Sequence, residues 1–337
     1  MRFIRPSATL AFAAILGMGL TACTPSGTPS GTLAEDSTVA PADCKVTSIG
    51  YSPNTLQTEF YQNFGNALKA AADAEGISYR DDDPLQDALN QVSGIENMIT
   101  AGVQSIAVRA QDANALSSAV AFAAEKNVTL VSLFGAFPGA NVTVGPDNTE
   151  LGGAIGQEAG KSLLDLKPGK SSYNVVILNN DSLGEAIIER RTSMEAAFKK
   201  LVPDYTVVAN VEALTEMEGN DALNTIIQKT RDIDVVLSTN DSSSLGAVSA
   251  LQAAGFQPGK DVVVAISGST ERDLQSIIDG LTPGGPYGDY DVWAKATLNA
   301  MKKSACGEPI TDADRALPLS IVDSSNAQEL YDKTYNK

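Results

Sequence analysis

Short apolar runs alternate along the chain with longer stretches in which apolar residues recur every three or four positions. The runs are typical of strands buried on both faces of a parallel sheet, and the recurrences indicate amphipathic helices. The predicted strands cover residues 45–51, 77–80, 103–108, 128–133, 173–178, 206–211, 235–237 and 261–266. Helices are predicted between them, joined to the strands by short connections. This repetition indicates an α/β fold with doubly wound parallel sheets.

The alternation is interrupted once, by a turn-rich segment at residues 145–148. Two consecutive α/β units of similar size flank it, so we expect two lobes. Residues 280–290 are rich in Gly and Pro and are the candidate for a second crossing between the lobes. Such residues suit a hinge that absorbs backbone rotation when two lobes move. A last long helix is predicted over residues 289–304.

Residues 232–255 have the clearest strand, turn and helix pattern in the sequence. The apolar run 235–237 is followed by Asn240 and Asp241, and three serines and an apolar helical stripe come next. Ligands of parallel α/β sheets bind beyond the carboxyl ends of the strands. Asn240 and Asp241 are therefore candidate ligand-binding residues, with groups suited to a hydroxyl-rich ligand.

The N-terminal segment has the pattern of an exported lipoprotein. Two arginines precede an apolar run that is too short for a stable membrane span. The sequence Leu20-Thr21-Ala22-Cys23 resembles a bacterial lipobox, which we favour over a secretory signal that merely contains a cysteine. Residues 1–22 are interpreted as the signal peptide, and residues 23–43 as the lipidated Cys23 with a flexible tether rich in Ser, Thr, Pro and Gly. We expect an exported protein anchored to the outer face of the cell membrane.

Composition removes several classes of function. The chain of 337 residues has a formal net charge of −17 and no histidine. This acidity argues against nucleic-acid binding, and the lack of histidine excludes His-based triads and His metal ligands. Neither a Walker A motif nor a Gly-x-Ser-x-Gly elbow occurs, so we expect no ATP hydrolysis and no hydrolase. Asp81-Asp82-Asp83 is interpreted as a solvated acidic turn, and no metal or cofactor is expected.

Several local patterns match a known family when they are taken in order. The pair Phe60-Tyr61 follows the first strand and its loop, and residues 95–115 have the order helix, Gly-Val, apolar strand and polar turn. Residues 145–148 contain an Asp-Asn turn, and residues 239–241 contain an Asn-Asp turn before a helix. Together these patterns resemble the type I periplasmic binding proteins of the ribose, galactose and xylose group, which are substrate-binding subunits of sugar ABC importers. The resemblance covers residues 45–333.

The resemblance implies two lobes joined by a multi-segment hinge. Residues 44–145 plus 285–318 form the N-terminal lobe, and residues 146–284 plus 319–337 form the C-terminal lobe. It also implies a monomer, not an enzyme, that binds a small sugar or polyol between its lobes and delivers it to a membrane permease with a separate ATPase. The open alternative is a sensor that presents an autoinducer-2-like or sugar signal to a receptor. Repressors share the fold, but they need a helix-turn-helix where this chain has a signal peptide.

Position by position, the resemblance implies a ligand site built from strand ends. Phe60 and Tyr61 stand where the family places aromatic rings against a sugar, although Phe60 also lies on the apolar stripe of its helix. Asn54 or Gln57 is a candidate polar contact from the preceding loop. Arg109 ends a strand where the family often has Asn, and it is expected either to hold a ligand hydroxyl or carboxylate or to form a salt bridge.

The second lobe contributes Asn240 as the expected ligand contact, whereas Asp241 is expected to bind ligand or, as we favour, to cap its helix. Three positions depart from the family. Phe134-Gly135 replaces an Asp-Arg pair, Ser267 replaces a carboxylate, and Tyr287 stands near the position of a Gln. Phe134, Ser267 and Tyr287 are kept as candidate ligand-binding residues, with the ring of Phe134 as a stacking surface. The departures leave the identity of the sugar or polyol open.

Two further expectations follow from the resemblance. Arg190 and Arg191 lie about one helical turn from the family's second-lobe arginine and are interpreted as solvated helix charges. Cys44 precedes the first strand and Cys306 follows the last long helix, which in the family reaches the same pole of the first lobe. We therefore expect a Cys44–Cys306 disulfide, as export to an oxidising compartment permits.

Overall fold

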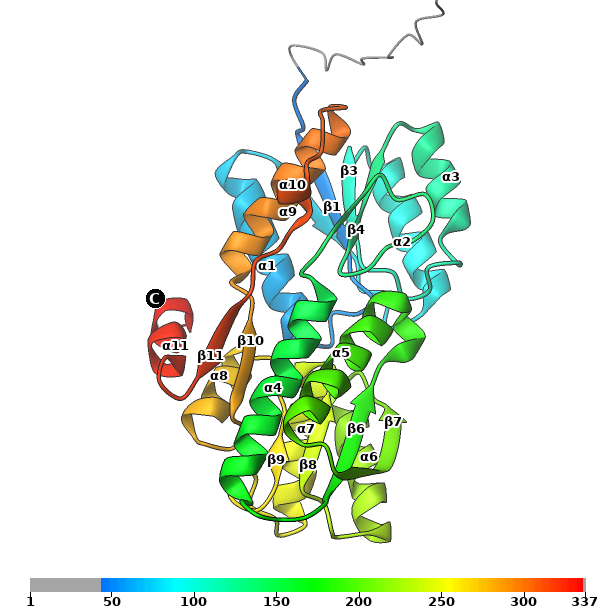
Figure 1. Ribbon diagram of the computed structural model, residues 1–337. Helices are drawn as coiled ribbons and strands as arrows, with labels where there is room; N and C mark the ends of the chain where they lie inside the picture. The colour runs from blue at the N-terminus through cyan, green and yellow to red at the C-terminus, as the bar shows by residue number, and fades with distance from the viewer. Residues whose placement is uncertain (1–43, 336–337) are drawn as a thin grey trace, which may run out of the picture. The chain divides into compact units, whose positions relative to one another are not determined.

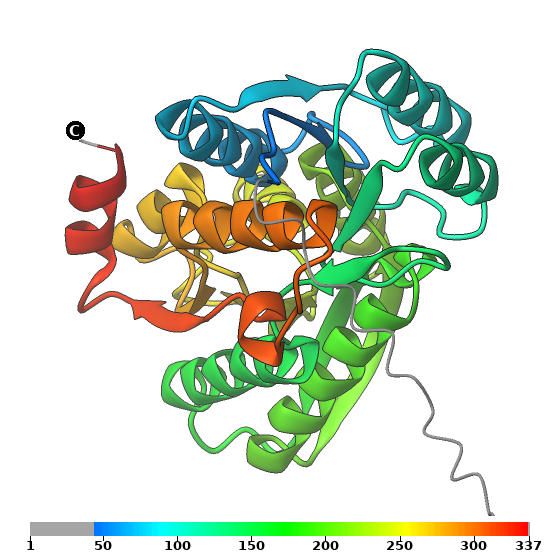
Figure 2. The same ribbon diagram turned by 90° about the horizontal axis from the view of Figure 1, so that it is seen from above.

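A parallel sheet of five strands, ordered β2-β1-β3-β4-β5, forms the first part of the structure (Figure 1). The computed structural model describes residues 44–335. The strands are β1 (Ser48–Ser52), β2 (Ser78–Asp81), β3 (Ser105–Val108), β4 (Thr129–Leu133) and β5 (Val142–Val144). Helices α1 (Glu59–Ala74) and α9 (Tyr290–Ala305) pack on one face, and α2 (Ala88–Thr100) and α3 (Ser117–Glu125) pack on the other. Figure 2 shows α9, far away in sequence, beside α1.

A second parallel sheet has four strands in the order β7-β6-β8-β9. Its strands are β6 (Tyr173–Asn179), β7 (Tyr205–Glu212), β8 (Val235–Ser238) and β9 (Val263–Val264). Helices α4 (Asn148–Leu166) and α5 (Glu185–Leu201) share one apolar cluster with this sheet, and α6 (Glu216–Lys229) and α7 (Asp241–Ala253) share another. Both sheets are thus covered on two faces, as the continuous apolar runs of their inner strands require.

A small antiparallel pair completes the fold. β10 (Gly284–Tyr287) pairs with β11 (Ser320–Asp323), and α8 (Glu271–Ile278) and α11 (Ala327–Tyr335) pack against it. The short helices η1 (Asp181–Leu183) and α10 (Asp312–Arg315) lie in connections. All the described elements belong to one compact unit.

The helix starts follow local sequence signals. Asp87 and Asp147 each accept two backbone N–H bonds at the starts of α2 and α4. Thr215 and Thr270 form capping boxes at the starts of α6 and α8. Each cap satisfies N–H groups that have no partner within the helix, which fixes where the chain turns from a strand end into a helix.

The predicted α/β fold class and the order of its strands and helices are confirmed. The strand predicted over residues 261–266 is shorter, because only Val263 and Val264 pair with β8. The antiparallel pair β10–β11 and helix α11 were not predicted. The exact lobe boundaries at 145/146, 284/285 and 318/319 stay predictions.

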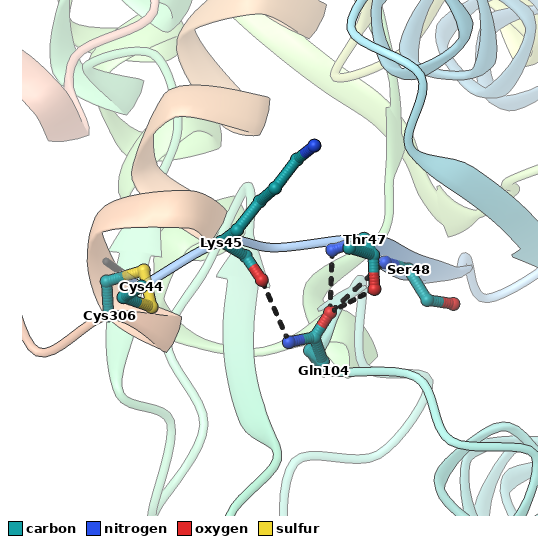
Figure 3. Close-up of a disulfide and its surroundings, with 6 residues drawn as sticks. All are labelled: Cys44, Lys45, Thr47, Ser48, Gln104 and Cys306. Atoms are coloured by element: carbon teal, nitrogen blue, oxygen red, sulfur yellow. Dashed lines mark hydrogen bonds between the residues drawn. A yellow bond between two sulfur atoms is a disulfide. The ribbon is translucent and has the colours of Figure 1, made fainter. Parts of the chain in front are cut away.

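The Cys44–Cys306 disulfide is confirmed, with the two Cα atoms 5.7 Å apart (Figure 3). Cys306 is the C-cap of α9, and Cys44 lies just before β1. The side chain of Gln104 holds the intervening segment, because its Oε1 accepts from the N–H of Thr47 at 2.7 Å and its Nε2 donates to the carbonyl of Lys45 at 3.3 Å. The bridge therefore ties the start of the first sheet to the end of α9.

The predictions of a signal peptide, a lipidated Cys23 and a tether concern residues 1–43. These residues lie outside the described range. Within residues 44–335, no helix has both the length and the apolar character needed to cross a membrane.

Candidate functional site

The carboxyl ends of strands from both sheets contribute to one pocket. It is lined by most of the predicted ligand-binding residues, namely Phe60, Tyr61, Arg109, Phe134, Asn240, Asp241 and Ser267. The first four belong to connections of the five-stranded sheet, and the other three follow strands of the four-stranded sheet. Parallel sheets place their ligand sites at this end of the strands. That these residues contact a ligand stays a prediction.

Two further candidate residues, Asn54 and Tyr287, are not among the lining residues, and their contact with a ligand stays a prediction. Asn54 lies fully buried in the loop after β1, and its backbone carbonyl accepts from the N–H of Gln86. Tyr287 buries its ring in the apolar cluster between β10 and α8, and its hydroxyl lies 3.4 Å from that of Thr334. Its neighbour Pro286 lines the pocket instead, because successive residues of a strand point to opposite faces.

Aromatic rings form one wall of the pocket. Phe60 lies within 5.2 to 6.2 Å, centroid to centroid, of the rings of Tyr61, Phe134, Tyr290 and Trp293. Phe60 is half-buried, so it serves both as core packing and as pocket lining. An apolar ring face of this kind suits the C–H face of a sugar or polyol.

Phe134 has an unusual backbone that places its ring in this wall. Its φ of 58° lies in the left-handed region, which costs a residue with a Cβ roughly 1 to 2 kcal/mol. The N–H of Phe134 donates to the carbonyl of Val144 at 2.9 Å, which holds the strained turn between β4 and β5. Strain of this type is concentrated at binding sites. This backbone conformation positions the ring of Phe134 in the aromatic wall of the pocket.

Arg109 reaches the pocket from the end of β3 and is only 2% exposed. Its carbonyl accepts from Nε2 of Gln91, a fully buried side chain that also bonds the carbonyl of Pro53 and the N–H of Gln111. A Cβ at Gly135 would lie 2.9 Å from Nη1 of Arg109, so glycine leaves room for the guanidinium. The predicted salt-bridge alternative is not what the structure shows, since no ion pair involves Arg109 within residues 44–335.

The cap of α7 is Asn240 and not Asp241, which corrects the favoured interpretation of Asp241, and both residues line the pocket. Asn240 is the N-cap of α7, because its Oδ1 accepts from the N–H of Ser243 at 2.9 Å. Its Nδ2 donates to Oδ1 of Asn180 at 2.5 Å and to the carbonyl of Ala213 at 3.1 Å. The cap falls to Asn240 because its backbone is extended, whereas Asp241 is the first residue of the helix.

Asp241 is 6% exposed and its Oδ2 has no hydrogen-bond partner. Burial, with the nearby charge of Glu59, raises the pKa of Asp241 to about 6, although Arg190 opposes the shift. Burial also raises the pKa of Asp273 well above its usual range, and the charge of Asp241 adds to this effect. A buried carboxylate oxygen without a partner is suited to accept a ligand hydroxyl.

Arg190 also lines the pocket, which corrects its interpretation as a solvated helix charge. Its Nε and Nη2 donate to Oδ1 of Asn148 at 3.1 and 2.9 Å, and its Nη1 donates to the carbonyl of Thr239 at 3.0 Å. Burial and then the charge of Arg109 lower the pKa of Arg190 to about 10, so the side chain is charged at neutral pH. Helix α5 presents this residue inward because it packs closely on α4.

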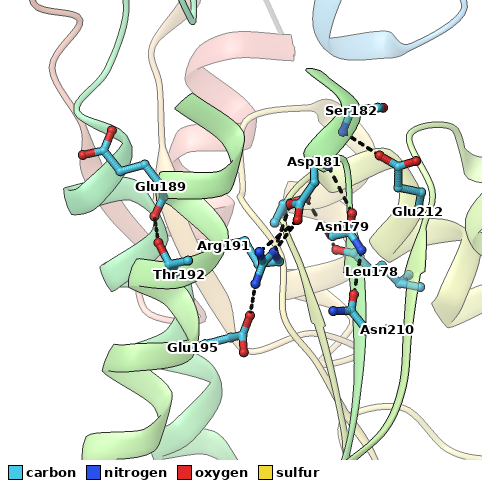
Figure 4. A network of polar contacts seen from close by, with 11 residues as sticks. Leu178, Asn179, Asp181, Ser182, Glu189, Arg191, Thr192, Glu195, Asn210 and Glu212 are labelled. Atoms are coloured by element: carbon cyan, nitrogen blue, oxygen red, sulfur yellow. Dashed lines mark hydrogen bonds and ion pairs between the residues drawn. The ribbon is translucent and has the colours of Figure 1, made fainter. Parts of the chain in front are cut away.

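Arg191, the next residue, is held differently. Its guanidinium forms ion pairs with Asp181 at 2.9 Å and with Glu195 at 2.6 Å (Figure 4). Asp181 lies in η1, so this pairing fixes the turn after β6 against α5. Arg191 is therefore a structural ion-pair residue, and the neighbouring Arg190 is the one at the pocket.

The comparisons with known proteins agree with this geometry. Residues 49–309 match the model of the periplasmic binding protein domain. The chain belongs to this family. The resemblance predicted from the sequence is thus confirmed, and proteins of this family act outside the cytoplasm.

Two curated relatives of this periplasmic binding protein match it over most of the chain. A putative rhizopine-binding protein of Rhizobium meliloti is 25% identical over 294 residues, which cover 85% of this chain and 93% of the relative. A ribose import binding protein of Bacillus subtilis is 26% identical over 242 residues, which cover 69% of this chain and 73% of the relative. Both are binding proteins, which confirms that this chain is not an enzyme.

The fold is also that of solved structures. A galactofuranose binding protein matches with a TM-score of 0.76 and 21% identity, over 86% of this chain and 98% of that protein. At this identity the match shows the shared fold alone.

Further residues of this periplasmic binding protein line the pocket without having been predicted from the sequence. They include Asn180 after β6 and Trp293 on α9. The rule that found Asn240, a polar residue after a buried strand, also applies to Asn180. Trp293 is the single tryptophan of the chain, and its Nε1 donates to the carbonyl of Pro318 at 2.8 Å. No local pattern marks it as a pocket residue, since it lies on an apolar helix face.

The acidic turn at residues 81–83 holds two backbone segments through hydrogen bonds to Asp83. Asp83 accepts from the N–H groups of Leu56 and Leu85, at 2.9 and 3.0 Å. In the described part of the chain, no group of three or more acidic or cysteine side chains is arranged to hold a metal ion.

Proposed function

We propose that this protein is an extracytoplasmic receptor that captures a small polyhydroxylated ligand, a sugar or a polyol, in the pocket between its two sheets. The observation that carries the proposal is the lining itself. Buried polar groups with free bonding capacity, on Arg109 and Asp241, face the same pocket as an aromatic wall of Phe60, Phe134 and Trp293. Polar groups that fix hydroxyls beside an apolar ring suit a ligand with both kinds of surface. The name of one relative, a ribose import binding protein, supports this class.

The same proposal covers delivery and location. The ligand-bound form docks on a membrane permease whose energy comes from a separate ATPase, and the protein acts as a monomer. Cys23 carries the lipid that holds it at the outer face of the cell membrane. The lipobox-like sequence before Cys23 and the family of the chain support these steps. A ligand that binds the closed arrangement more tightly than the open one drives closure.

A thermal-shift screen with pentoses, hexoses, furanose sugars, inositols, linear polyols and sugar acids tests the proposal. A ligand at 100 times its Kd raises stability by about 2.7 kcal/mol through linkage, which is readily measured. Arg190→Lys should abolish most of the shift, because a lysine cannot reproduce the three guanidinium bonds. Arg191→Lys, on the same helix but outside the pocket lining, is the matched control and should keep it. No shift with any compound, or equal loss in both variants, would contradict the proposal.

A further inference from the structure

Neither arginine of the pocket forms a salt bridge in the described part of the chain, although the nearby charge of Asp241 favours the charged form of Arg190. Arg109 is 2% exposed, and its buried Nε has no hydrogen-bond partner. Arg190 donates three hydrogen bonds, but all of them go to the neutral oxygens of Asn148 and Thr239. The neighbouring Arg191, by contrast, is paired with two carboxylates, those of Asp181 and Glu195.

The charges around the pocket do not balance. Arg109 and Arg190 each contribute +1, and Asp241 is the one acidic residue among the lining residues of the described chain, which leaves 2 − 1 = +1. Asp273 lies behind Asp241 and uses Oδ2 to cap α8 through the N–H of Thr270. Glu59 lines a neighbouring pocket and accepts from the N–H of Glu271 at 2.7 Å. Neither of these carboxylates is placed to compensate the arginines.

An uncompensated buried guanidinium is costly, since the effective desolvation penalty of a buried ion is several kcal/mol. The cost disappears when an anion arrives with the ligand. Arg109 has more hydrogen-bond donors available for such an anion than Arg190. No hydrogen bond of the Arg109 guanidinium to residues 44–335 is found, whereas Arg190 already uses three of its five donors. A guanidinium matches the geometry of a carboxylate through two parallel hydrogen bonds.

We propose that the ligand is a polyhydroxylated monocarboxylate, of the aldonate or uronate class, whose carboxylate binds Arg109. The net charge of +1 fits one carboxylate rather than a phosphate dianion. Asp241 and Asn180 then face the hydroxyl groups, and the aromatic wall faces the carbon chain or ring. This inference rests on the proposed function and names the substrate class of the same pocket.

Isothermal titration calorimetry at about pH 7.5 and low ionic strength compares acids with their neutral counterparts. The sets are xylonate, xylose and xylitol; gluconate, glucuronate, glucose and glucitol; and galactonate, galacturonate, galactose and galactitol. Glucose 6-phosphate is included as the dianion. We expect an acid to bind about 100-fold more tightly than the neutral members of its set, because its charge pairs with a buried guanidinium.

The outcomes separate the two proposals. Tight binding of a neutral sugar or polyol, with weaker binding of its acid, overturns the proposal that the ligand carries a carboxylate. The proposed function is unaffected by that result. Preference for glucose 6-phosphate also overturns it. Binding of no compound in any set counts against both proposals.

Variants of Arg109 add a readout of the residue itself. Arg109→Met should lower the affinity for the acid about 100-fold and change the affinity for its neutral counterpart by less than about fivefold. Arg109→Lys, which keeps the charge, should restore part of the preference for the acid. Unfolding curves confirm that both variants fold. Equal losses for the acid and the neutral compound in Arg109→Met would refute a charge-specific role.

Discussion

Replacing Gly152 with alanine perturbs the pocket from a distance, through the packing of α4 on α5. A Cβ at position 152 would lie 2.0 Å from the carbonyl oxygen and 3.0 Å from the Cα of Arg190. Real Cβ atoms essentially never come closer than 3.0 Å to a non-bonded heavy atom of another segment. The backbones of the two helices must therefore separate by about 1 Å. The clash involves backbone, which cannot rotate away as a side chain would. The variant therefore moves the residue that presents a guanidinium to the pocket.

The expected magnitudes follow from this geometry. Overpacking of this kind costs about 1 to 3 kcal/mol of unfolding free energy. Arg190 is held by hydrogen bonds of 2.9 to 3.1 Å to Asn148 and Thr239, which a displacement of about 1 Å breaks or weakens. We expect ligand affinity to fall about tenfold or more, equivalent to about 1.4 kcal/mol.

Gly153→Ala is the matched control. It lies one residue further along α4, and a Cβ there meets no atom within 4 Å. Alanine is favoured over glycine inside a helix by roughly 0.5 to 1 kcal/mol, so this variant should be more stable than the parent and bind ligand equally well. Urea unfolding followed by circular dichroism measures stability, and calorimetry measures affinity. The reasoning is refuted if Gly152→Ala is as stable as Gly153→Ala.

Further predictions concern the bridge, the cap and the buried acid. Replacing Cys44 and Cys306 together with serine should lower the unfolding free energy by about 2 to 5 kcal/mol, because the bridge spans 262 residues; a loss below about 1 kcal/mol in urea unfolding would argue against it. Asn240→Ala should cost about 1 to 2 kcal/mol through loss of the α7 cap, whereas Asn240→Ser, which loses the same Nδ2 donor but keeps an oxygen that can cap the helix, should cost less; equal losses would exclude the cap as the cause. Burial raises the pKa of Asp241 from 3.8 to about 6, so its contribution to stability is present below about pH 4 and is lost as the pH rises through 6. Asp241→Asn should accordingly gain stability relative to the parent by about 2 to 3 kcal/mol between pH 4 and pH 7.5, measured by urea unfolding without ligand; a constant difference across this range would contradict the shift.

Much of the fold could be predicted because its signal is local and repeated. Strands such as β8 are fully buried on both faces and appear in the sequence as short apolar runs followed by polar residues. The same rule located Asn240 and Asp241 at the pocket, since both follow a buried strand, whereas Arg109 was named from the family resemblance. The antiparallel pair β10–β11 could not be predicted, because its strands contain Gly and Pro and pair over a long sequence separation.

The differences between the expected site and the structure have physical causes as well. Arg190 lies on a helix, where a difference of one residue changes the face, and only the close packing of α4 on α5 decides which of two arginines turns inward. Asn240 and Asp241 are both good caps, and the choice depends on which backbone is extended. Tyr287 and Pro286 differ by one position in a strand, so their faces depend on the register with β11.

The fluorescence of Trp293 tests the central claim most directly, because it is the single tryptophan of the chain and it lines the pocket. A titration with any ligand found by calorimetry should change its emission saturably, with one binding site and with the Kd that calorimetry gives. Binding detected by calorimetry without a change in Trp293 emission would place the ligand elsewhere and contradict the assignment of this pocket.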